Sequence, residues 1–267
     1  MIFLKKNFKI ASNISMSAKI ITILTPTYNR AGRLLAETIE SVQKQKEKGF
    51  THEHIIIDNA STDNTKEFVA GFIKKDPRVK YIRKRTNTLA SGALNRGLAK
   101  AKGDLILPLD DDDLIPPHAL QWYKEFMDKH PKIDWAAART LFIDEESRIK
   151  IGWANHPVVL KNLKKFLIRQ IKANSITNGS VIFRRRAIIK AGGWDETFPS
   201  SQDAVMYCRL INAGCPAAAI DKYLGIYRIH HAQLSTENSK NGNWKYCKER
   251  LMQQYNITQQ DLDKIKL

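Results

Sequence analysis

Cysteine is scarce in this sequence, and long apolar runs are absent. The 267 residues include three cysteines, Cys208, Cys215 and Cys247, which form no Cys-x-x-Cys pair. Neither a disulfide framework nor a zinc site is therefore indicated, and a reducing cytoplasm is the expected setting. No stretch reaches the roughly 18 apolar residues of a membrane-spanning helix, and the first residues lack the apolar core of a signal peptide. We therefore expect a chain that is neither exported nor membrane-spanning.

The sequence also lacks the glycine-rich motifs with which many α/β proteins hold phosphate groups. Neither Gly-x-Gly-x-x-Gly nor Gly-x-x-x-x-Gly-Lys-[Ser/Thr] occurs. The dinucleotide-binding and P-loop forms of α/β architecture therefore have no support. Any phosphate group that this protein binds must be held by other means.

Acidic side chains are missing from a long segment of the second half. No Asp or Glu lies between Glu146 and Asp195, and the formal net charge of the whole chain is +17. Such a charge points to an anionic partner, either nucleic acid, a membrane surface or a phosphorylated small molecule. The basic residues of this segment are Arg148, Lys150, Lys161, Lys164, Lys165, Arg169, Lys172, Arg184, Arg185, Arg186 and Lys190.

Part of this basic segment has the pattern of an amphipathic helix. Apolar residues repeat on one helical face, and basic residues lie largely elsewhere. Two interpretations stay open, an ordinary surface helix or a helix that contacts an anionic membrane. The apolar positions are Leu160, Leu163, Leu167 and Ile171, and the basic positions are Lys161, Lys164, Lys165, Arg169 and Lys172.

From residue 20 onward the sequence alternates between strand and helix patterns. Short apolar runs predict strands at residues 20–24, 54–57, 79–82 and 105–109, and helical periodicity predicts a helix in each interval. This alternation is typical of an α/β fold with a parallel sheet covered by helices on both faces. In such folds ligands bind outside the carboxyl ends of the strands.

Polar clusters follow three of the predicted strands directly. Residues 25–30 follow the first strand, Asp58 ends the second, and four consecutive carboxylates, Asp110 to Asp113, follow the fourth. Four adjacent carboxylates repel one another, so a cation is expected beside them. Magnesium or manganese fits best, because each takes one or two carboxylates and completes its shell with water and diphosphate oxygens. The sequence therefore predicts a metal-assisted site for a nucleotide-linked substrate.

At these positions the sequence resembles glycosyltransferase family 2 enzymes, which have the GT-A fold. The resemblance implies an inverting enzyme that moves a sugar from a nucleotide-diphospho-sugar to a hydroxyl group. It also implies a divalent metal cofactor, Mn²⁺ or Mg²⁺, and we favour UDP as the nucleotide. The stretches that carry the resemblance are residues 25–30, 58–65, 87–97 and 109–113, and later residues 179–196 and 227–235.

The resemblance implies roles for individual residues. Asp112 matches the metal ligand of the family, Asp58 the residue near the base, and Asp110 the residue near the ribose. Asp203 matches the base that deprotonates the acceptor hydroxyl, and His230 matches a histidine that can approach the metal or the diphosphate. The residues expected to bind the nucleotide-sugar are Thr25, Pro26, Thr27, Tyr28, Arg30, Asp58, Asn87, Asn95, Asp110 and Asp111.

The chain departs from the family pattern at three positions. Leu89 stands where the pattern usually has glycine, and Leu94 stands where a basic residue is common. Arg85 and Arg96 are the candidates to replace the donor contacts of that loop. Gln202 replaces the usual Glu of an acidic pair, and this leaves the single carboxylate that an in-line displacement needs.

The predicted organisation is one α/β domain of GT-A type with a short extension at each end. The first half of the domain is expected to bind the donor, and the second half to bind the acceptor. The ranges are residues 1–17 for a flexible N-terminal extension, 18–115 for the donor half and 116–235 for the acceptor half of the single domain 18–235, and 236–267 for a polar, helical tail.

The expected acceptor is a hydroxyl of a surface glycan or of its lipid-linked precursor. The expected location is the cytoplasm, including the inner face of the cell membrane, and no nucleic acid is expected as a partner. Two other functions stay open from the residues alone. A metal-dependent nucleotidyltransferase or phosphohydrolase would use the same Asp cluster without needing Asp203. A nucleic-acid-binding protein would follow from charge alone.

Overall fold

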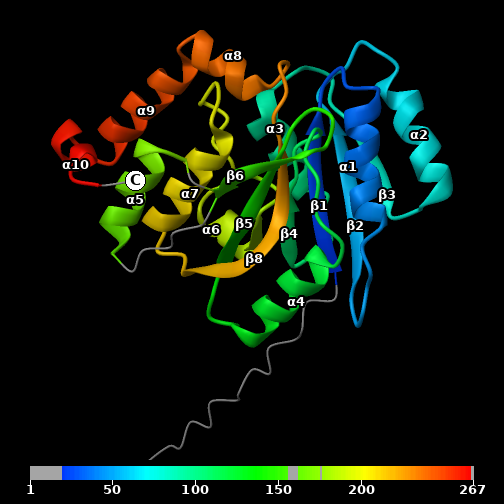
Figure 1. Cartoon of the computed structure of the whole chain (residues 1–267), viewed down its shortest axis with the longest axis horizontal. Helices are drawn as coiled ribbons and strands as arrows, with labels where there is room; N and C mark the ends of the chain where they lie inside the picture. Colours follow the sequence, from blue (N-terminus) through cyan, green and yellow to red (C-terminus); the bar gives the residue numbers. More distant parts are fainter. Residues whose placement is uncertain (1–19, 156–161, 175, 266–267) are drawn as a thin grey trace, which may run out of the picture.

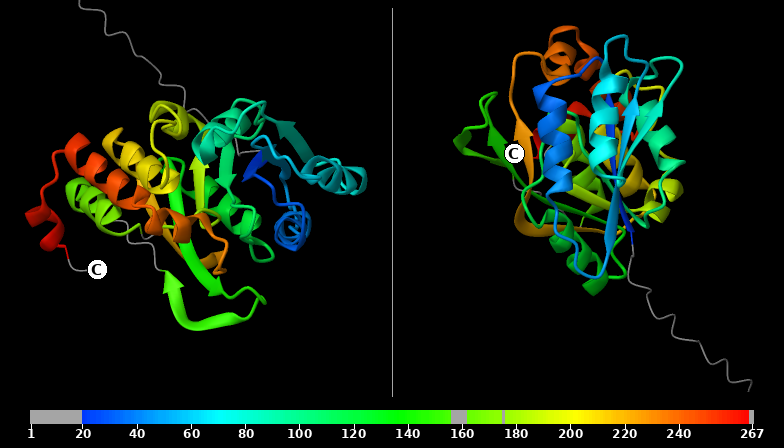
Figure 2. Two further views of the ribbon diagram at one scale, coloured as in Figure 1. Left: turned by 90° about the horizontal axis from the view of Figure 1, so that it is seen from above. Right: turned by 90° about the vertical axis from the view of Figure 1, so that its right-hand side faces the viewer.

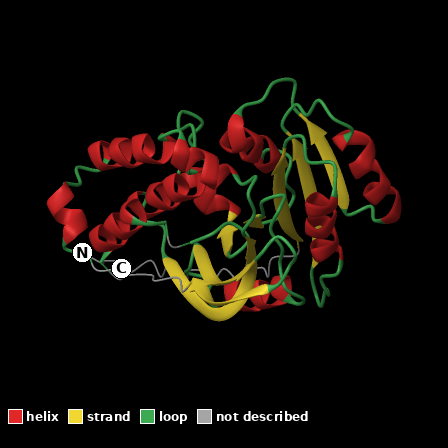
Figure 3. Ribbon diagram, turned by 45° about the horizontal axis from the view of Figure 1, so that its top comes forward, coloured by secondary structure: helices red, strands yellow, loops and turns green. Residues whose placement is uncertain are grey.

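A computed structural model of the chain describes residues 20–155, 162–174 and 176–265 (Figure 1). Its centre is one sheet whose strands run in the order β3-β2-β1-β4-β7-β5-β6, with β8 paired to β5. Figure 3 shows this sheet between helices, as the predicted α/β architecture requires. The fold class is therefore confirmed.

The first half of the chain forms the parallel part of the sheet. Strands β1 to β4 are parallel wherever they pair, and each predicted strand is present. The elements are β1 (Ile20–Thr27), α1 (Arg33–Gln43), β2 (Thr51–Asp58), α2 (Thr65–Lys75), β3 (Val79–Arg83), α3 (Leu89–Leu98) and β4 (Leu105–Pro108).

The second half extends the same sheet with mixed strand directions. Strand β7 is antiparallel to β4 and β5, β6 is antiparallel to β5, and β8 is parallel to β5. The sheet is thus mostly rather than wholly parallel. The elements are α4 (Ala119–Lys129), β5 (Trp135–Ile143), β6 (Ile149–Asn155), α5 (Leu163–Lys172), β7 (Val181–Arg184), α6 (Arg185–Lys190), α7 (Gln202–Asn212), β8 (Ala217–Arg228), α8 (Leu234–Lys240), α9 (Asn243–Gln254) and α10 (Gln259–Asp263).

Two apolar layers hold the helices on the sheet, because successive strand residues point to opposite faces. In β5, Trp135 and Ala137 join the core that helices α3, α5, α6, α7 and α9 share, whereas Ala136 and Ala138 face α1 and α4. Helix α2 packs with α1 in a smaller cluster on β2 and β3. Each face of the sheet is therefore covered, and the binding edge is formed by the loops at the strand ends.

The C-terminal helices are part of this packing. Cys247 and Leu251 of α9 and Leu262 of α10 are buried in the largest core cluster. Figure 2 shows α9 lying beside α7 and α5. Residues 236–267, expected as a polar tail, thus contain helices that contribute to the main core. Cys208, Cys215 and Cys247 are free and buried.

Helix α5 is the predicted amphipathic helix, and its apolar face is covered by protein. Phe166, Leu167 and Ile171 are buried in the core, where α5 contacts α7 and α9. Lys172 Nζ donates hydrogen bonds to the carbonyls of Leu262 and Ile265, 3.0 and 2.9 Å away. The helix is therefore a surface helix of the fold.

Two residues assigned to that helix pattern, Leu160 and Lys161, lie outside the described residues. Within the ranges that the structure describes, none of the helices is long and apolar enough to span a bilayer.

The strand ends of the first half are in register at one edge. Thr27 of β1 pairs with Asp58 of β2, and Asp58 pairs with Arg83 of β3. The Leu109 N–H, just past the end of β4, donates to the Leu24 carbonyl at 2.9 Å. The loops that begin after these residues therefore leave the sheet side by side, as the sequence pattern predicted.

A buried histidine links β1 and β2 beneath this edge. His54 is fully buried, and its Nε2 lies 2.9 Å from the Thr25 hydroxyl oxygen. Burial, with a smaller effect of His52, lowers the pKa of His54 to about 3. The imidazole is therefore neutral in the folded protein near neutral pH.

We predict that His54→Gln weakens the acid sensitivity of folding. The unfolded chain takes up a proton on His54 near pH 6.5 but the folded chain does not, so the stability that His54 contributes is present above that pH and is lost below it. Between pH 6.5 and 5 the parent should lose about 2 kcal/mol more than the variant. Urea unfolding at a series of pH values measures this difference, and parallel pH curves for the two proteins would contradict it.

Candidate active site

The four carboxylates after β4 point to different partners. The Asn178 amide donates to both oxygens of Asp110, at 3.1 and 3.3 Å. The Thr27 hydroxyl donates to Asp111 Oδ2 at 2.6 Å, and Arg30 Nε lies 3.5 Å from Asp111 Oδ1. The loops after β1 and before β7 thus meet on the acidic loop.

The other two carboxylates face the end of β8. His230 Nε2 lies 2.9 Å from Asp112 Oδ2, and Arg30 Nη2 lies 3.7 Å from the same oxygen. Asp113 is buried and accepts a hydrogen bond from the Arg228 N–H at 2.9 Å. The structure therefore brings together Asp112 and His230, which are 118 residues apart in the chain.

Burial makes this loop electrostatically unfavourable when it is fully ionised. Desolvation, together with the negative charge of Asp112, raises the pKa of Asp110, Asp111 and Asp113 above that of an ordinary aspartate. Arg30 opposes the shift at Asp111, and Arg228 opposes it at Asp113. Because these cations offset only part of the effect, an additional positive charge would stabilise the loop.

The donor groups present suit a divalent metal. Among the described residues no three His, Cys, Asp or Glu side chains form a ready-made metal-binding group. Asp112 and His230 nevertheless offer a carboxylate oxygen and an imidazole nitrogen 2.9 Å apart. Manganese accepts both kinds of ligand, and it can take its remaining ligands from diphosphate oxygens and water. The residues therefore fit a metal that binds together with a nucleoside diphosphate.

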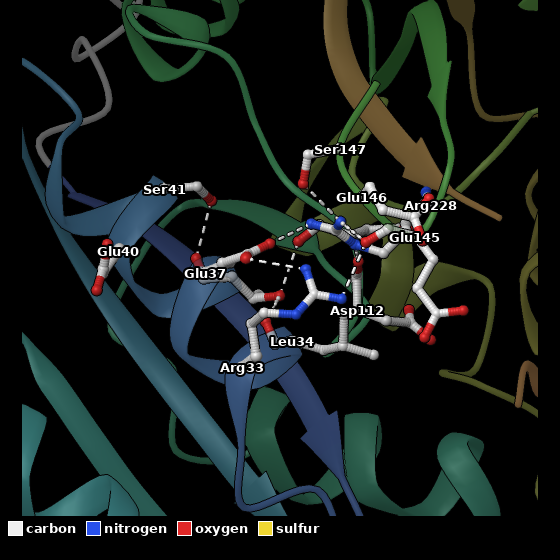
Figure 4. A network of polar contacts seen from close by, with 12 residues as sticks. Arg33, Leu34, Glu37, Glu40, Ser41, Asp112, Glu145, Glu146, Ser147 and Arg228 are labelled. Atoms are coloured by element: carbon white, nitrogen blue, oxygen red, sulfur yellow. Dashed lines mark hydrogen bonds and ion pairs between the residues drawn. The ribbon is translucent and has the colours of Figure 1, made fainter. Parts of the chain in front are cut away.

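A buried arginine fixes the acidic loop to the rest of the domain (Figure 4). Arg228 is fully buried, and its Nε donates to the Asp112 carbonyl at 3.0 Å. Its Nη1 donates to the Ser147 hydroxyl at 2.8 Å, and its Nη2 to Glu37 Oε2 at 2.5 Å. One side chain thereby ties α1, the acidic loop and the β5–β6 turn to the end of β8.

The carboxylate at the end of β2 has polar partners of its own. Asp58 is fully buried and accepts hydrogen bonds from the Ser61 N–H at 2.7 Å, from the Tyr81 hydroxyl and from Arg83 Nη1 at 3.3 Å. Tyr28, the first residue after β1, is exposed over 46% of its surface. Because Thr27 pairs with Asp58, the chain at Tyr28 leaves the sheet beside the end of β2.

Several other residues expected to bind the donor contact protein groups instead. Thr25 faces His54 inside the sheet, and Pro26 pairs with Ile57 within β1 and β2. The Asn95 amide donates to the Trp194 carbonyl and to Glu196, and its oxygen accepts from the Trp194 N–H. These side chains therefore belong to the framework around the site.

Asn87 also contacts a neighbouring loop. Its side-chain oxygen accepts from the Asn59 amide at 2.8 Å and from the Leu89 N–H at 3.0 Å. The same Asn59 amide donates to the Leu89 carbonyl at 3.1 Å. Asn87 thus shapes the loop after β3 and holds it against the loop after β2.

Asp203 lies at the start of α7, next to the acidic loop. The Ala204 N–H donates to its Oδ1 at 2.8 Å, and the Asn174 amide donates to its Oδ2. Burial raises the pKa of Asp203, and the charge on Asp203 is one of the causes that raise the pKa of Asp110. Asp203, which matches the catalytic base, therefore lies within electrostatic reach of Asp110, which matches the residue near the ribose.

Two residues of the site, Asn174 and Asn178, carry no sequence signal of their own. They lie in the polar loop between α5 and β7. Their partners are distant along the chain, so no local pattern identifies them. An asparagine-containing loop directly before a core strand is the nearest available clue. Arg228 lies in the matched segment 227–235, but its role as a link was not predicted.

The fold is that of a GT-A glycosyltransferase, and comparison with known proteins agrees. Residues 22–192 match the family described as Glycosyl transferase family 2. The chain belongs to this family and is a glycosyltransferase. An uncharacterized glycosyltransferase of Methanocaldococcus jannaschii is 27% identical over 214 residues, which are 80% of this chain and 72% of that protein.

Two solved structures share the fold. Residues 1–349 of Staphylococcus aureus TarS in complex with UDP superpose with a TM-score of 0.64 at 20% identity, over 87% of this chain and 64% of that one. The mannosyltransferase PcManGT of Pyrobaculum calidifontis in complex with GDP-Man and Mn²⁺ gives 0.62 at 18% identity, over 89% and 65%. This chain therefore spans less than two thirds of either solved chain.

We predict that Arg228→Met destabilises the fold by about 3–5 kcal/mol. The variant leaves the Glu37 carboxylate and the main-chain carbonyls of Asp112 and Glu145 without their buried hydrogen-bond donor. The control is Arg33→Met, which removes an arginine with 50% side-chain exposure, 3.1 Å from the same Glu37. That change should cost less than about 1 kcal/mol. Urea unfolding of both variants measures the contrast, and equal losses would show that Arg228 is not the link described.

Proposed function

We propose that the protein transfers a sugar from a nucleotide-diphospho-sugar to an acceptor hydroxyl with inversion at the anomeric carbon. The observation that carries this proposal is the position of Asp203, a partly buried carboxylate at the start of α7 within electrostatic reach of Asp110. A single in-line displacement requires a general base beside the acidic loop at which the donor is proposed to bind. Nucleotidyl transfer and phosphate hydrolysis would have no use for this second carboxylate, and family membership also argues against both.

The donor is proposed to lie along the edge formed by β2, β1 and β4. Asp58 ends β2 and the acidic loop follows β4, and β1 lies between them. Neighbouring strands are about 4.8 Å apart, so the ends of β2 and β4 are separated by about 10 Å, which suits the length of a nucleoside diphosphate. Asp58 then faces the base, Asp110 the ribose, and Asp112 with His230 the diphosphate.

Mn²⁺ or Mg²⁺ is the proposed cofactor, held by Asp112 and His230. When bound, such a metal neutralises negative charge on the departing diphosphate. The complexes of TarS with UDP and of PcManGT with GDP-Man and Mn²⁺ support a nucleotide donor and a metal of this class. UDP is our favoured nucleotide.

Asp203 is proposed to accept the proton of the attacking hydroxyl. Its Oδ1 is oriented by the Ala204 N–H and its Oδ2 by the Asn174 amide, and each oxygen keeps a lone pair for the acceptor. Burial raises its pKa, which makes the ionised form a stronger base. As the oxygen–carbon bond forms, the bond from the anomeric carbon to the diphosphate breaks, and the proton stays on Asp203.

The proposed acceptor is a hydroxyl of a surface glycan or of a lipid-linked precursor. A net charge of +17 supports an anionic acceptor or an anionic membrane surface. Because the apolar face of α5 is buried in the core, contact of this helix with a bilayer would be electrostatic. We propose that residues 18–115 bind the donor and residues 116–235 the acceptor.

Removing the metal-ligand carboxylate should abolish metal-dependent donor binding. We predict that Asp112→Asn lowers the affinity for UDP in the presence of Mn²⁺ by at least about tenfold, because a neutral amide cannot replace the charged ligand. Calorimetric titration at fixed Mn²⁺ measures the affinity. Glu40→Gln, a change on the exposed side of α1, is the control. Parental affinity of Asp112→Asn would remove Asp112 from the metal site.

Replacing the base should separate catalysis from binding. We predict that Asp203→Asn lowers the transfer rate by about 100- to 10,000-fold and changes the free energy of donor binding by less than about 1 kcal/mol. Transfer from the nucleotide-sugar and calorimetry with Mn²⁺ measure the two effects. Near-parental transfer would place the base elsewhere, and loss of donor binding would place Asp203 in the donor site.

A further inference from the structure

Left-handed backbone conformations gather in the loops of the site. Asn29 and Ala60 occur in the loops after β1 and β2 with φ of 50° and 71°. Leu89 begins α3 with φ of 57°, and Ser201 directly precedes α7, the helix that carries Asp203, with φ of 60°. Residues other than glycine rarely adopt this conformation, because their Cβ atom clashes with the backbone. Within the described ranges, the other non-glycine residues of this kind are His118, Ser147 and Asn256.

Leu89 is the least expected of these residues. A leucine side chain gains nothing from the left-handed region, whereas glycine, usual at this position in the family pattern, would adopt it without strain. Leu89 is also 47% exposed, so packing against the protein does little to offset the strain. Strain of this kind in a loop of a binding site calls for a functional explanation.

Side-chain hydrogen bonds hold Leu89 in this conformation. Its N–H donates to Asn87 Oδ1 at 3.0 Å, and its carbonyl accepts from Asn59 Nδ2 at 3.1 Å. The Asn59 amide also donates to Asn87 Oδ1 at 2.8 Å. The strained segment from Asn87 to Leu89 is therefore hydrogen-bonded to Asn59, the residue that directly follows Asp58. These bonds hold Leu89 in a defined position.

The sheet order places two residues with exposed side chains in the segments on either side of the end of β2. Strand β2 lies between β3 and β1, so the start of α3, which carries Leu89, and the loop after β1, which carries Tyr28, flank the end of β2. Tyr28 is 46% exposed and Leu89 47%, whereas Asp58 is fully buried. A flat group such as a nucleobase, placed over the end of β2, would bury part of the apolar surface that these two side chains expose.

We propose that Leu89 contacts the nucleoside of the donor and determines donor affinity from that end. The proposal rests on the proposed function, because it takes the end of β2 at Asp58 as the site of the nucleobase. The isobutyl group loses its exposed surface only when a nucleoside is bound, so its contribution appears in the affinity and not in the folding stability. The diphosphate, at the Asp112 end, should not sense this side chain.

Leu89→Gly and Leu89→Ala test the proposal together. Glycine removes both the side chain and the strain, whereas alanine removes most of the side chain and keeps the strain. Calorimetry with Mn²⁺ is carried out with UDP, GDP, UMP and inorganic pyrophosphate. Both variants should bind UMP, and the diphosphate that the parent prefers, about five- to twentyfold more weakly. Pyrophosphate affinity should stay within twofold of the parent, and urea unfolding should show Leu89→Gly at least as stable as the parent.

His118→Gly is the matched control. His118 is exposed, has φ of 65° and directly precedes α4. The substitution therefore relieves the same kind of strain outside the proposed donor site. It should leave all four affinities unchanged.

Three results would overturn the proposal. Nucleotide affinity within twofold of the parent in both Leu89 variants would show that the side chain does not touch the ligand. An equal loss for pyrophosphate would show a general disturbance of the site. Lower folding stability of Leu89→Gly with unchanged affinity would make Leu89 a packing residue. If the parent binds neither UDP nor GDP, the proposed function fails, and the role of Leu89 fails with it.

Discussion

Four consecutive carboxylates at the end of β4, of which Asp111 and Asp113 are buried and the other two are partly buried, are the constraint on which the rest of the site depends. Each carboxylate needs a compensating group, and each group comes from a different part of the chain. Thr27 and Arg30 come from the end of β1 and the loop after it, Asn178 from the loop before β7, and His230 from the segment after β8. The second half of the chain is therefore tied to the first by electrostatic need as well as by apolar packing, and charge compensation stays incomplete without a cation.

The first half of the fold could be predicted from the sequence because its signals are local. Buried parallel strands appear as continuous apolar runs, and the helices between them repeat at helical spacing. Strands β6 and β8 were not predicted. Residues Ala217–Arg228 of β8 combine three alanines, three charged residues and a glycine, and their buried and exposed positions do not alternate. Only the pairing with β5 makes this segment a strand.

The candidate site, like the fold, could be predicted only in part from the sequence. The family resemblance pointed to Asp112, His230 and Asp203, and the structure places them around one acidic loop. The resemblance covers Arg228 but could not show its role, because the hydrogen bond from Arg228 to Glu37 joins residues 191 positions apart. Amphipathic periodicity identified α5 correctly as a helix but could not show what covers its apolar face, since α7 and α9 come from distant parts of the sequence. A sequence pattern thus indicates which residues carry chemistry, whereas the residues that orient them become visible only in the fold.

The central claim is that the acidic loop binds a metal and a nucleoside diphosphate together. The most direct measurement is thermal unfolding of the parent protein with UDP, GDP, ADP and CDP, each with Mn²⁺ and with a chelator. A ligand at about 100 times its dissociation constant adds about 2.7 kcal/mol to the free energy of unfolding. We expect one or two diphosphates, UDP foremost, to raise the unfolding temperature with Mn²⁺ and to lose that effect with the chelator. No stabilisation by any diphosphate, or equal stabilisation with the chelator, would contradict the account.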